Sequence, residues 1–279
     1  MRSVGFQGLR GAYSEMAILQ AFEGQSVRPK AFPSFDAVFA ALTEGSIPDA
    51  LLPIENSMAG LIHENLDGLD NYPVHIVGEE IFRVQHCLLV LPGTSLRSLR
   101  TVISHPQALA QCGQFLRKKG LEPRSFFDTA GAAQFLAAEK PPAMAAIASA
   151  QAAKLYGLEM ASQSIADSSD NLTRFLHLKR QGARIPKTQA GDKERRLSML
   201  ALRLPGGFPR LVALSQLLQS FGLPTVHCEA RPSREEPWQY VYFLEIAGGP
   251  EHPQWKAALA ALGPCVLGLK VLGSYGSNR

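Results

Sequence analysis

Cysteine is scarce in this sequence, and long apolar runs are missing. The 279 residues include four cysteines that lie far apart and form no C-x-x-C pair, so reduced thiols are expected rather than disulfide bridges or metal ligands. The longest apolar stretches, residues 87–91 and 141–148, are far shorter than the roughly 18 residues of a membrane span. The first residues lack the long apolar region of a signal peptide, so a cytoplasmic location is expected.

Several catalytic and cofactor signatures are also absent. The seven histidines never occur four residues apart, and no carboxylate–histidine cluster has the spacing of a metal site. There is no G-x-S-x-G nucleophile elbow and no G-x-x-x-x-G-K phosphate loop. Gly5, Gly8 and Gly11 are spaced G-x-x-G-x-x-G, which differs from the G-x-G-x-x-G dinucleotide fingerprint. The sequence therefore predicts an activity without a metal or a cofactor.

The excess of positive charge is small and local. The net charge is +4, yet the segment from Lys179 to Arg196 alone holds seven basic and two acidic residues. Residues 181–196 are polar and show no hydrophobic period, which predicts a linker between two domains. Because a solvated linker accounts for the net charge, neither a nucleic acid nor a membrane is an expected partner.

Residues 1–180 alternate short apolar runs with helical patterns, which is typical of α/β layering. Ser14 and Ser34 are candidate N-caps of the first two helices. A buried strand at residues 102–104 leads into a helix over residues 106–119, and residues 171–178 alternate as a strand.

The C-terminal part has a different order of elements. Strands are expected at residues 197–204, 225–230, 239–246 and 266–271, with helices at residues 210–221 and 254–262. This βαββαβ order predicts a ferredoxin-like unit.

Four segments carry polar side chains where a strand ends or a helix begins. The turn at residues 8–14 offers backbone N–H groups and a helix dipole that favour an anion such as a carboxylate. Residues 55–57 and 104–107 follow apolar runs, where open α/β sheets bind ligands. In residues 170–175, Arg174 could bind a carboxylate through two hydrogen bonds. Each segment also has an ordinary structural alternative: a helix cap, a βα loop or a solvent-facing arginine.

Taken together, these segments resemble the prephenate dehydratase and arogenate dehydratase family. The similarity rests on Pro53-Ile54-Glu55-Asn56-Ser57, on Ser104-His105-Pro106-Gln107-Ala108-Leu109-Ala110-Gln111-Cys112 and on Asn171-Leu172-Thr173-Arg174-Phe175. Gly11-Ala12-Tyr13-Ser14 is similar to the family's glycine-rich opening motif, and Glu229-Ala230-Arg231-Pro232 to a motif of its C-terminal ACT domain. The resemblance covers nearly the whole chain.

The resemblance implies a two-lobed catalytic domain, like periplasmic binding proteins, at residues 1–180. One lobe would combine about residues 1–75 with 165–180, and the other would hold about residues 76–164. The linker at residues 181–196 then leads to an ACT regulatory domain at residues 197–279. A homodimer or homotetramer through the ACT domain is expected.

The implied reaction removes water and carbon dioxide from prephenate and gives phenylpyruvate, in phenylalanine biosynthesis; from arogenate the product is phenylalanine. Thr173 is implied as the catalytic proton donor or its organiser. The implied substrate-binding residues are Arg174, Phe175, Asn56, Ser57, Ser14, Ser104 and Glu55. Phe175 would pack against the substrate ring or the core. Glu55 is either a second acid–base group or a carboxylate that secures its loop.

Phenylalanine is the implied effector, with Glu229, Arg231, Pro232 and Leu211 as its residues. Ala230 stands where the family has serine, and Arg210 where it has glycine, which weakens the expectation of phenylalanine inhibition and leaves another effector open. A non-catalytic amino-acid sensor is the main alternative to an enzyme. The intact Thr173-Arg174-Phe175 motif favours the enzyme, and the choice between prephenate and arogenate stays open.

Overall fold

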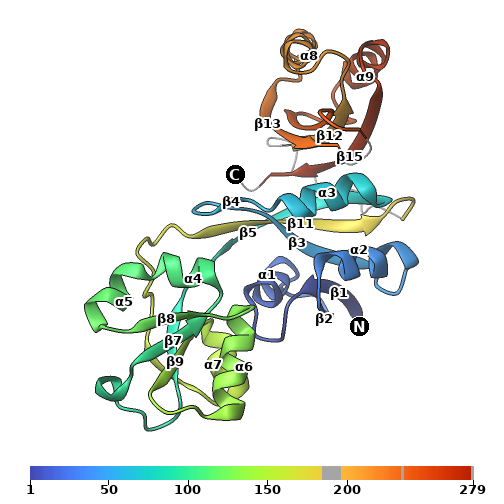
Figure 1. Ribbon diagram of the computed structural model, residues 1–279. Coiled ribbons are helices and arrows are strands. Elements are labelled where there is room, and N and C mark those ends of the chain that lie inside the picture. Colours follow the sequence, from blue (N-terminus) through green and yellow to red (C-terminus); the bar gives the residue numbers. More distant parts are fainter. Residues whose placement is uncertain (184–195, 234–235, 278–279) are drawn as a thin grey trace. The chain divides into compact units, whose positions relative to one another are not determined.

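The computed structural model describes residues 1–183, 196–233 and 236–277, which form two compact units (Figure 1). The first unit holds residues 1–38, 51–61 and 81–175, and the second holds residues 39–50, 62–80 and 176–279. Three strands have one end in each unit: β3 (Asp49–Asn56), β5 (Val74–Arg83) and β11 (Leu172–Arg180). The predicted boundaries of the two lobes and of the ACT domain stay predictions.

A five-stranded sheet with helices on both faces makes up much of the first unit. Its strand order is β10-β6-β9-β7-β8, with β6 (Cys87–Val90), β7 (Thr101–Ser104), β8 (Glu122–Ser125), β9 (Met144–Ala148) and β10 (Glu159–Ser162). One face packs against α4 (Pro106–Gln111) and α5 (Gly113–Lys119), and the other against α6 (Thr129–Glu139) and α7 (Ala150–Tyr156). Successive residues of β6, such as Leu88 and Leu89, point into the two separate cores in turn, as strand geometry requires.

β1, β2 and most of β3 also belong to the first unit, within the strand order β5-β11-β3-β1-β2 that includes residues of both units. β1 (Arg2–Gln7) runs parallel to β2 (Val27–Phe32), and α1 (Tyr13–Ala21) packs its apolar side on Val4 and Phe6 of β1. α2 (Phe35–Glu44) follows β2, and Ser34 caps it by accepting a hydrogen bond from Ala37 N, as predicted. The short strand β4 (Gly60–Leu61) pairs with the end of β3.

The second unit contains the predicted βαββαβ order. Its elements are β12 (Arg196–Arg203), α8 (Phe208–Ser220), β13 (Thr225–Pro232), β14 (Tyr240–Ala247), α9 (Trp255–Leu262) and β15 (Gly268–Gly276). The antiparallel sheet has the order β13-β14-β12-β15, and both helices cover one face of it (Figure 1). Leu200, Leu214, Leu244 and Leu262 are among the buried residues between these layers.

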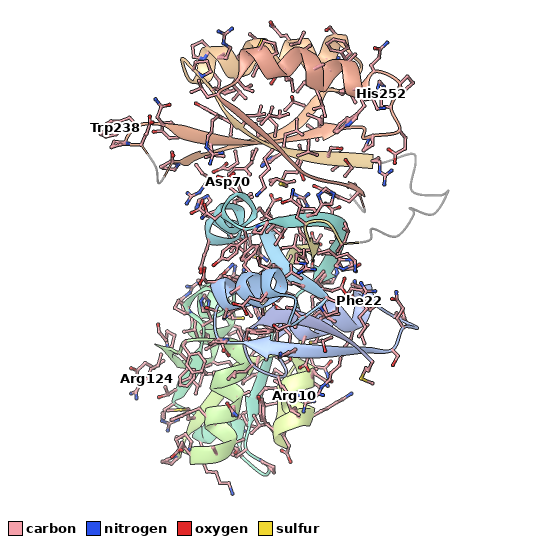
Figure 2. The ribbon with its side chains drawn as sticks, turned by 90° about the vertical axis from the view of Figure 1, so that its right-hand side faces the viewer. Arg10, Phe22, Asp70, Arg124, Trp238 and His252 are labelled. Carbon is pink, nitrogen blue, oxygen red and sulfur yellow. The ribbon has the colours of Figure 1, made fainter. Side chains whose placement is uncertain are left out.

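The other face of this sheet contacts α3 (His63–Asn71), which also belongs to the second unit. Figure 2 shows Asp70 of α3 next to the sheet, where it pairs with Arg203. β15 meets β5 at Gly273, opposite Ile76. A Cβ atom at Gly273 would lie 2.2 Å from the backbone oxygen of Ile76, so this close approach requires glycine.

Several sequence predictions are wrong in detail. Ser14 is not an N-cap, because α1 begins at Tyr13 and its N-cap residue is Ala12. The helix expected over residues 106–119 is two helices, divided at Cys112, and the Asp167 carboxylate accepts from Gln114 N and so stabilises the second start. α8 begins at Phe208 because Pro209 fits the first turn of a helix.

The strands that the sequence does not reveal are polar strands at the edges of the sheets. β8 is exposed along its whole length, and β2 has no apolar face that is fully buried. Such strands lack the alternation on which prediction depends. Short 3-10 helices occupy Leu96–Ser98 and Gly263–Cys265. Within the part of the chain that the structure describes, no helix is both long enough and apolar enough to cross a membrane.

Candidate functional site

Thr173 and Asn56 lie side by side in the first unit. Asn56 ends β3, Thr173 is the second residue of β11, and both are buried. Asn56 Nδ2 donates to Thr173 Oγ1 over 3.0 Å, while Asn56 Oδ1 accepts from the backbone N–H groups of Met58 and Ala59 at 3.1 and 3.0 Å. Because a backbone N–H can only donate, these two bonds fix which end of the Asn56 amide faces Thr173. Thr173 is thus held as an acceptor, and its own O–H remains a donor.

Four further side chains extend this contact: those of Asn171, Gln111 and His86 are buried, and that of Tyr13 is partly buried. Asn171 Oδ1 accepts from Asn56 Nδ2 at 2.7 Å, and Asn171 Nδ2 donates to Gln111 Oε1 at 2.9 Å. Gln111 Oε1 also lies 2.8 Å from His86 Nε2, and His86 Nδ1 lies 2.8 Å from the Tyr13 hydroxyl. We call these six residues, Tyr13, His86, Gln111, Asn171, Asn56 and Thr173, the Thr173 network. Hydrogen bonds join all of them across segments up to 117 residues apart.

The Thr173 network carries no net charge at neutral pH. Burial lowers the pKa of His86, and its hydrogen bond with Gln111 opposes this only in part, so the ring is neutral. Burial raises the pKa of Tyr13 well above its ordinary value, so the phenol keeps its proton. Amides and hydroxyls supply every other polar group of the network. The site can therefore direct hydrogen bonds at a substrate without placing a charge beside Thr173.

Arg174 brings a positive charge to the neighbouring position. Its side chain is buried, and Nη1 lies 3.9 Å from Oε2 of the half-buried Glu55. Strand alternation places Arg174 and Thr173 on opposite faces of β11. Glu55 thus stands beside a buried arginine, as a carboxylate that secures its loop would.

Ser57 holds the loop in front of β11. Its hydroxyl donates to Asp170 O at 2.7 Å and accepts from Leu172 N at 3.0 Å, and its own N–H donates to Leu172 O at 2.8 Å. These three bonds fix the start of the strand that carries Thr173. Ser57 therefore positions the site, whatever else it binds.

Three predicted substrate contacts lie apart from the Thr173 network. Phe175 is buried in the apolar core with Val4 and Phe6, so of its two predicted environments the structure shows the core. The hydroxyl of Ser104 is fully buried and donates to Ile147 O at 2.6 Å, which ties β7 to β9. Ser14 lies in the first turn of α1.

The turn at residues 8–14 is already occupied by an internal carboxylate. Gly11 N–H donates to Glu15 Oε2, and Glu15 Oε1 lies 3.6 Å from Arg10 Nε. An intramolecular carboxylate thus takes the place at Gly11 where the sequence predicted an external anion. The physical reason is local, because a glutamate in the first helical turn reaches back to the preceding N–H groups.

A comparison with protein families identifies the chain. The family model described as prephenate dehydratase matches residues 4–183. The chain belongs to the prephenate dehydratase family. Arogenate dehydratase/prephenate dehydratase 2, chloroplastic, of Arabidopsis thaliana is 39% identical over 281 residues, which are 98% of this chain and 72% of that protein. Arogenate dehydratase 2 of Petunia hybrida is 36% identical, over 99% of this chain and 72% of that protein.

Solved structures share the fold along the whole chain. The quorum-quenching acylase GqqA is 32% identical with a TM-score of 0.87, and the match covers 100% of this chain and 99% of that one. Prephenate dehydratase from Arthrobacter aurescens, in complex with L-Phe, is 24% identical with a TM-score of 0.88, over 99% and 90% of the two chains. The predicted α/β fold class of this prephenate dehydratase family member is confirmed.

Sequence reasoning missed four members of the Thr173 network. Gln111 and Asn171 stand inside the motifs that carry the family resemblance, yet only their neighbours are predicted as site residues. Each is a buried amide, and a polar residue within an apolar helix face is the signal that could have found Gln111. Tyr13 likewise stands in the opening motif, beside the predicted Ser14. His86 carries a weaker signal, because it only precedes the buried strand β6.

The predicted effector residues lie on two different faces of the C-terminal sheet. Glu229 Oε1 lies 3.4 Å from His63 Nε2 of α3, and Arg231 binds both carboxylate oxygens of Asp67 at 3.0 and 3.1 Å. Pro232 ends β13 on the same strand. Leu211 is instead buried on the helix side, under a groove of about 470 Å³ along α8 that Phe208, Val212 and Gln216 also line.

Two further basic residues contact α3. Arg203 pairs with Asp70 at 2.8 Å, and Lys270 Nζ donates to the carbonyl oxygens of Leu69, Asp70 and Tyr72 at 2.8–2.9 Å. The bond with Asp67 raises the pKa of Arg231, and burial lowers the pKa of Lys270. We call the contacts of Arg203, Arg231 and Lys270 with α3 the α3 contact.

Proposed function

We propose that this prephenate dehydratase family member converts prephenate to phenylpyruvate, water and carbon dioxide. The observation that carries the proposal is the bond from Asn56 Nδ2 to Thr173 Oγ1. An amide N–H cannot accept, so the Thr173 hydroxyl keeps its own proton for a substrate. A bond donated to Oγ1 also polarises the hydroxyl, which an unassisted threonine needs to act on a leaving group.

The reaction requires a proton at the departing ring hydroxyl. Thr173 O–H gives its proton to that oxygen, the C–O bond breaks and water leaves, and a proton from solvent then restores the threonine hydroxyl. The C–C bond to the ring carboxylate breaks in the same sequence, its electron pair completes the aromatic ring, and carbon dioxide leaves. Formation of the aromatic ring drives the reaction, so the site has to position groups rather than supply a nucleophile.

Arg174 is the proposed partner of a substrate carboxylate. Its buried guanidinium lies on the other face of β11 from Thr173 and has Glu55 within 3.9 Å, so the proposal requires the substrate to reach both faces where this strand begins. A guanidinium offers the paired donors that a carboxylate accepts. Asn56 and Ser57 hold this edge of the site in place, and Ser14 and Ser104 stay predictions as substrate contacts.

Arogenate is the alternative substrate, and the relatives named above give it equal support. It differs from prephenate only in carrying an amino group in place of the keto group. The test is side-by-side kinetics, with phenylpyruvate measured by its absorbance in alkali and phenylalanine by amino-acid analysis. Turnover of either substrate supports the proposed reaction. Binding of both without turnover contradicts it and supports an amino-acid sensor.

Hydrolysis of an acyl amide is a second candidate, favoured by the full-length match at 32% identity to an acylase. Such a reaction needs an activated nucleophile or water. In the part of the chain described by the structure, His86 contacts the Tyr13 hydroxyl and Gln111 rather than a serine or threonine. The same assay with an N-acyl amide and detection of the free amine distinguishes the two candidates.

We also propose that phenylalanine acts on the C-terminal unit as an allosteric effector, and that this unit joins two or four chains. The α8 groove beside Leu211 supports both proposals, since Phe208 and Val212 leave apolar surface exposed there. Phenylalanine titrations of the rate and light scattering of the purified chain test them. A rate that phenylalanine leaves unchanged contradicts the effector proposal. A monomeric mass, with and without phenylalanine, contradicts the proposed assembly.

The proposed location is the cytoplasm. All four cysteines are free in the structure, including the buried Cys87 and Cys112, as a reducing compartment favours. Cell fractionation with an antibody to the chain tests the location. Recovery of the chain in an extracytoplasmic fraction contradicts it.

A further inference from the structure

The proposed function uses Thr173 and Asn56, but the hydrogen-bond chain does not stop there. It continues through Asn171 and Gln111 to His86, which is 2% exposed and has a partner at each ring nitrogen. A buried imidazole with both nitrogens engaged has a fixed orientation, so only its tautomer remains to be determined.

Two backbone N–H groups fix the orientation of the Asn56 amide, and the direction of the bonds from Asn56 to His86 follows from it step by step. Met58 N and Ala59 N hold Asn56 Oδ1, so Asn56 Nδ2 faces Asn171 Oδ1. Asn171 must then present Nδ2 to Gln111, which must accept at Oε1. The remaining partner of Gln111 Oε1 is His86 Nε2, which can only approach an acceptor with a hydrogen. Gln111 Nε2 also faces Asn56 Oδ1 at 3.4 Å, which agrees with this orientation. The neutral ring therefore carries its proton on Nε2. The Tyr13 hydroxyl has two acceptors within reach, Gln85 O at 3.1 Å and His86 Nδ1 at 2.8 Å, and it donates to the nearer one, Nδ1.

The same series of hydrogen bonds with every amide turned round would be unstable. If His86 Nε2 lacked a proton, Gln111 would have to turn its amide, and its Nε2 would then face Asn171 Nδ2. Relieving that clash reverses Asn171 and then Asn56, which places Nδ2 of Asn56 against two backbone N–H groups. Each buried donor without an acceptor destabilises the folded chain, because its lost hydrogen bonds with water are not replaced. With the amides turned round, Thr173 would also donate to Asn56 and lose its free proton.

We propose that His86, held by Tyr13, is a positioning residue that donates from Nε2 to Gln111 and thereby keeps the Thr173 hydroxyl directed at the substrate. This rests on the proposed function, because it assigns a role through Thr173. His86 itself touches no reacting atom in this scheme. Its contribution is to fix which way the amides of the Thr173 network face.

Two substitutions of similar size separate the ring nitrogens. In His86→Gln the side-chain amide nitrogen can take the place of Nε2 and donate to Gln111. In His86→Asn the shorter amide takes the place of Nδ1 and leaves Gln111 without this donor. We expect kcat within about threefold of the parent chain for His86→Gln and a loss of about ten- to a hundredfold for His86→Asn, with KM changed less than twofold in both. Equal losses, or no loss in His86→Asn, overturn the proposal.

The tautomer provides a readout on the parent chain that does not depend on turnover. In the parent chain labelled with ¹⁵N-histidine, the His86 resonances should show a proton on Nε2 and none on Nδ1 at neutral pH; His86→Gln identifies them by their loss. A proton on Nδ1 alone overturns the proposal. Thr173→Val distinguishes failure of the proposed function from failure of the inference about His86. Full turnover in Thr173→Val contradicts the proposed role of Thr173. An inactive Thr173→Val beside a fully active His86→Asn contradicts only the role of His86.

Discussion

The Thr173 network and the α3 contact use opposite means to hold two segments together. The network joins five buried side chains and the partly buried Tyr13 by directed hydrogen bonds among amides, hydroxyls and a neutral imidazole. The α3 contact joins three basic residues to two carboxylates and three backbone carbonyls, and its pairs are partly exposed. Direction matters in the first region and charge in the second. Exchanging an amide for a carboxylate, or the reverse, should therefore change mainly the rate in the first region and mainly the stability in the second.

The largest effect is expected where the network ends at the substrate. Thr173→Val keeps the shape of the side chain and removes the hydroxyl, so the departing ring oxygen loses its donor. We expect kcat to fall at least about a hundredfold, the usual scale for a positioned proton-transfer group. Thr173→Ser keeps the hydroxyl and is the control, with most of the rate retained. Steady-state kinetics on prephenate and arogenate measure both, and full activity of Thr173→Val would contradict the site.

Asn56→Asp reverses one bond without changing the size of the side chain. An ionised carboxylate can only accept, so Thr173 must donate to it and can no longer donate to the substrate. We expect kcat to fall by about ten- to a hundredfold at neutral pH. The variant should recover relative to the parent chain as pH falls, because a protonated carboxyl regains a donor. A pH–rate profile of both chains checks this, and a loss that is the same at every pH would count against it.

Asp67→Asn is the same exchange in the opposite direction, made in the α3 contact. It removes the charge opposite Arg231 and places an amide donor against one of the two arginine donors. Because the pair is partly buried, we expect a loss of about 1–2 kcal/mol in the free energy of unfolding and a kcat within about twofold of the parent chain. Urea unfolding and kinetics measure the two quantities. A large loss of kcat with unchanged stability would show that α3 acts on the Thr173 network.

The neutral state of His86 predicts a pH dependence of stability. Burial lowers its pKa in the folded chain, so below the ordinary histidine pKa of about 6.5 the unfolded chain binds a proton that the folded chain does not. Stability contributed by the neutral ring is thus present above that pH and is lost as pH falls below it, by at most about 1.4 kcal/mol per pH unit for one proton. His86→Gln should show a flatter decline between pH 6.5 and 5. Thermal unfolding of both chains across this range checks the difference, and parallel curves would mean that His86 is not neutral.

The sequence predicts the ends of these two regions better than their connections. Thr173, Asn56 and Ser57 are predicted as site residues because they stand in short motifs, and the βαββαβ order is predicted because its strands and helices alternate clearly. The bonds from Asn171 to Gln111 and from Gln111 to His86 span 60 and 25 residues, and no local pattern brings such residues together. The pair of Arg231 with Asp67 is not predicted for a related reason, because the two residues are 164 positions apart in the sequence. Local propensity identifies elements, whereas tertiary pairing determines which polar groups meet.

The smallest effect is expected beside the α3 contact, where His63 of α3 meets Glu229. The His63 side chain is 50% exposed and the Glu229 side chain 27% exposed, and the two attract only when the imidazole is protonated. Solvent screens such a pair, so His63→Gln should change the free energy of unfolding by less than about 0.5 kcal/mol at pH 7.5. Asp67→Asn, measured in the same buffer, is the matched comparison, because Asp67 lies in the α3 contact itself. If His63→Gln destabilised the chain as strongly as Asp67→Asn, charge would act across the whole face of α3 rather than through its partly buried pairs.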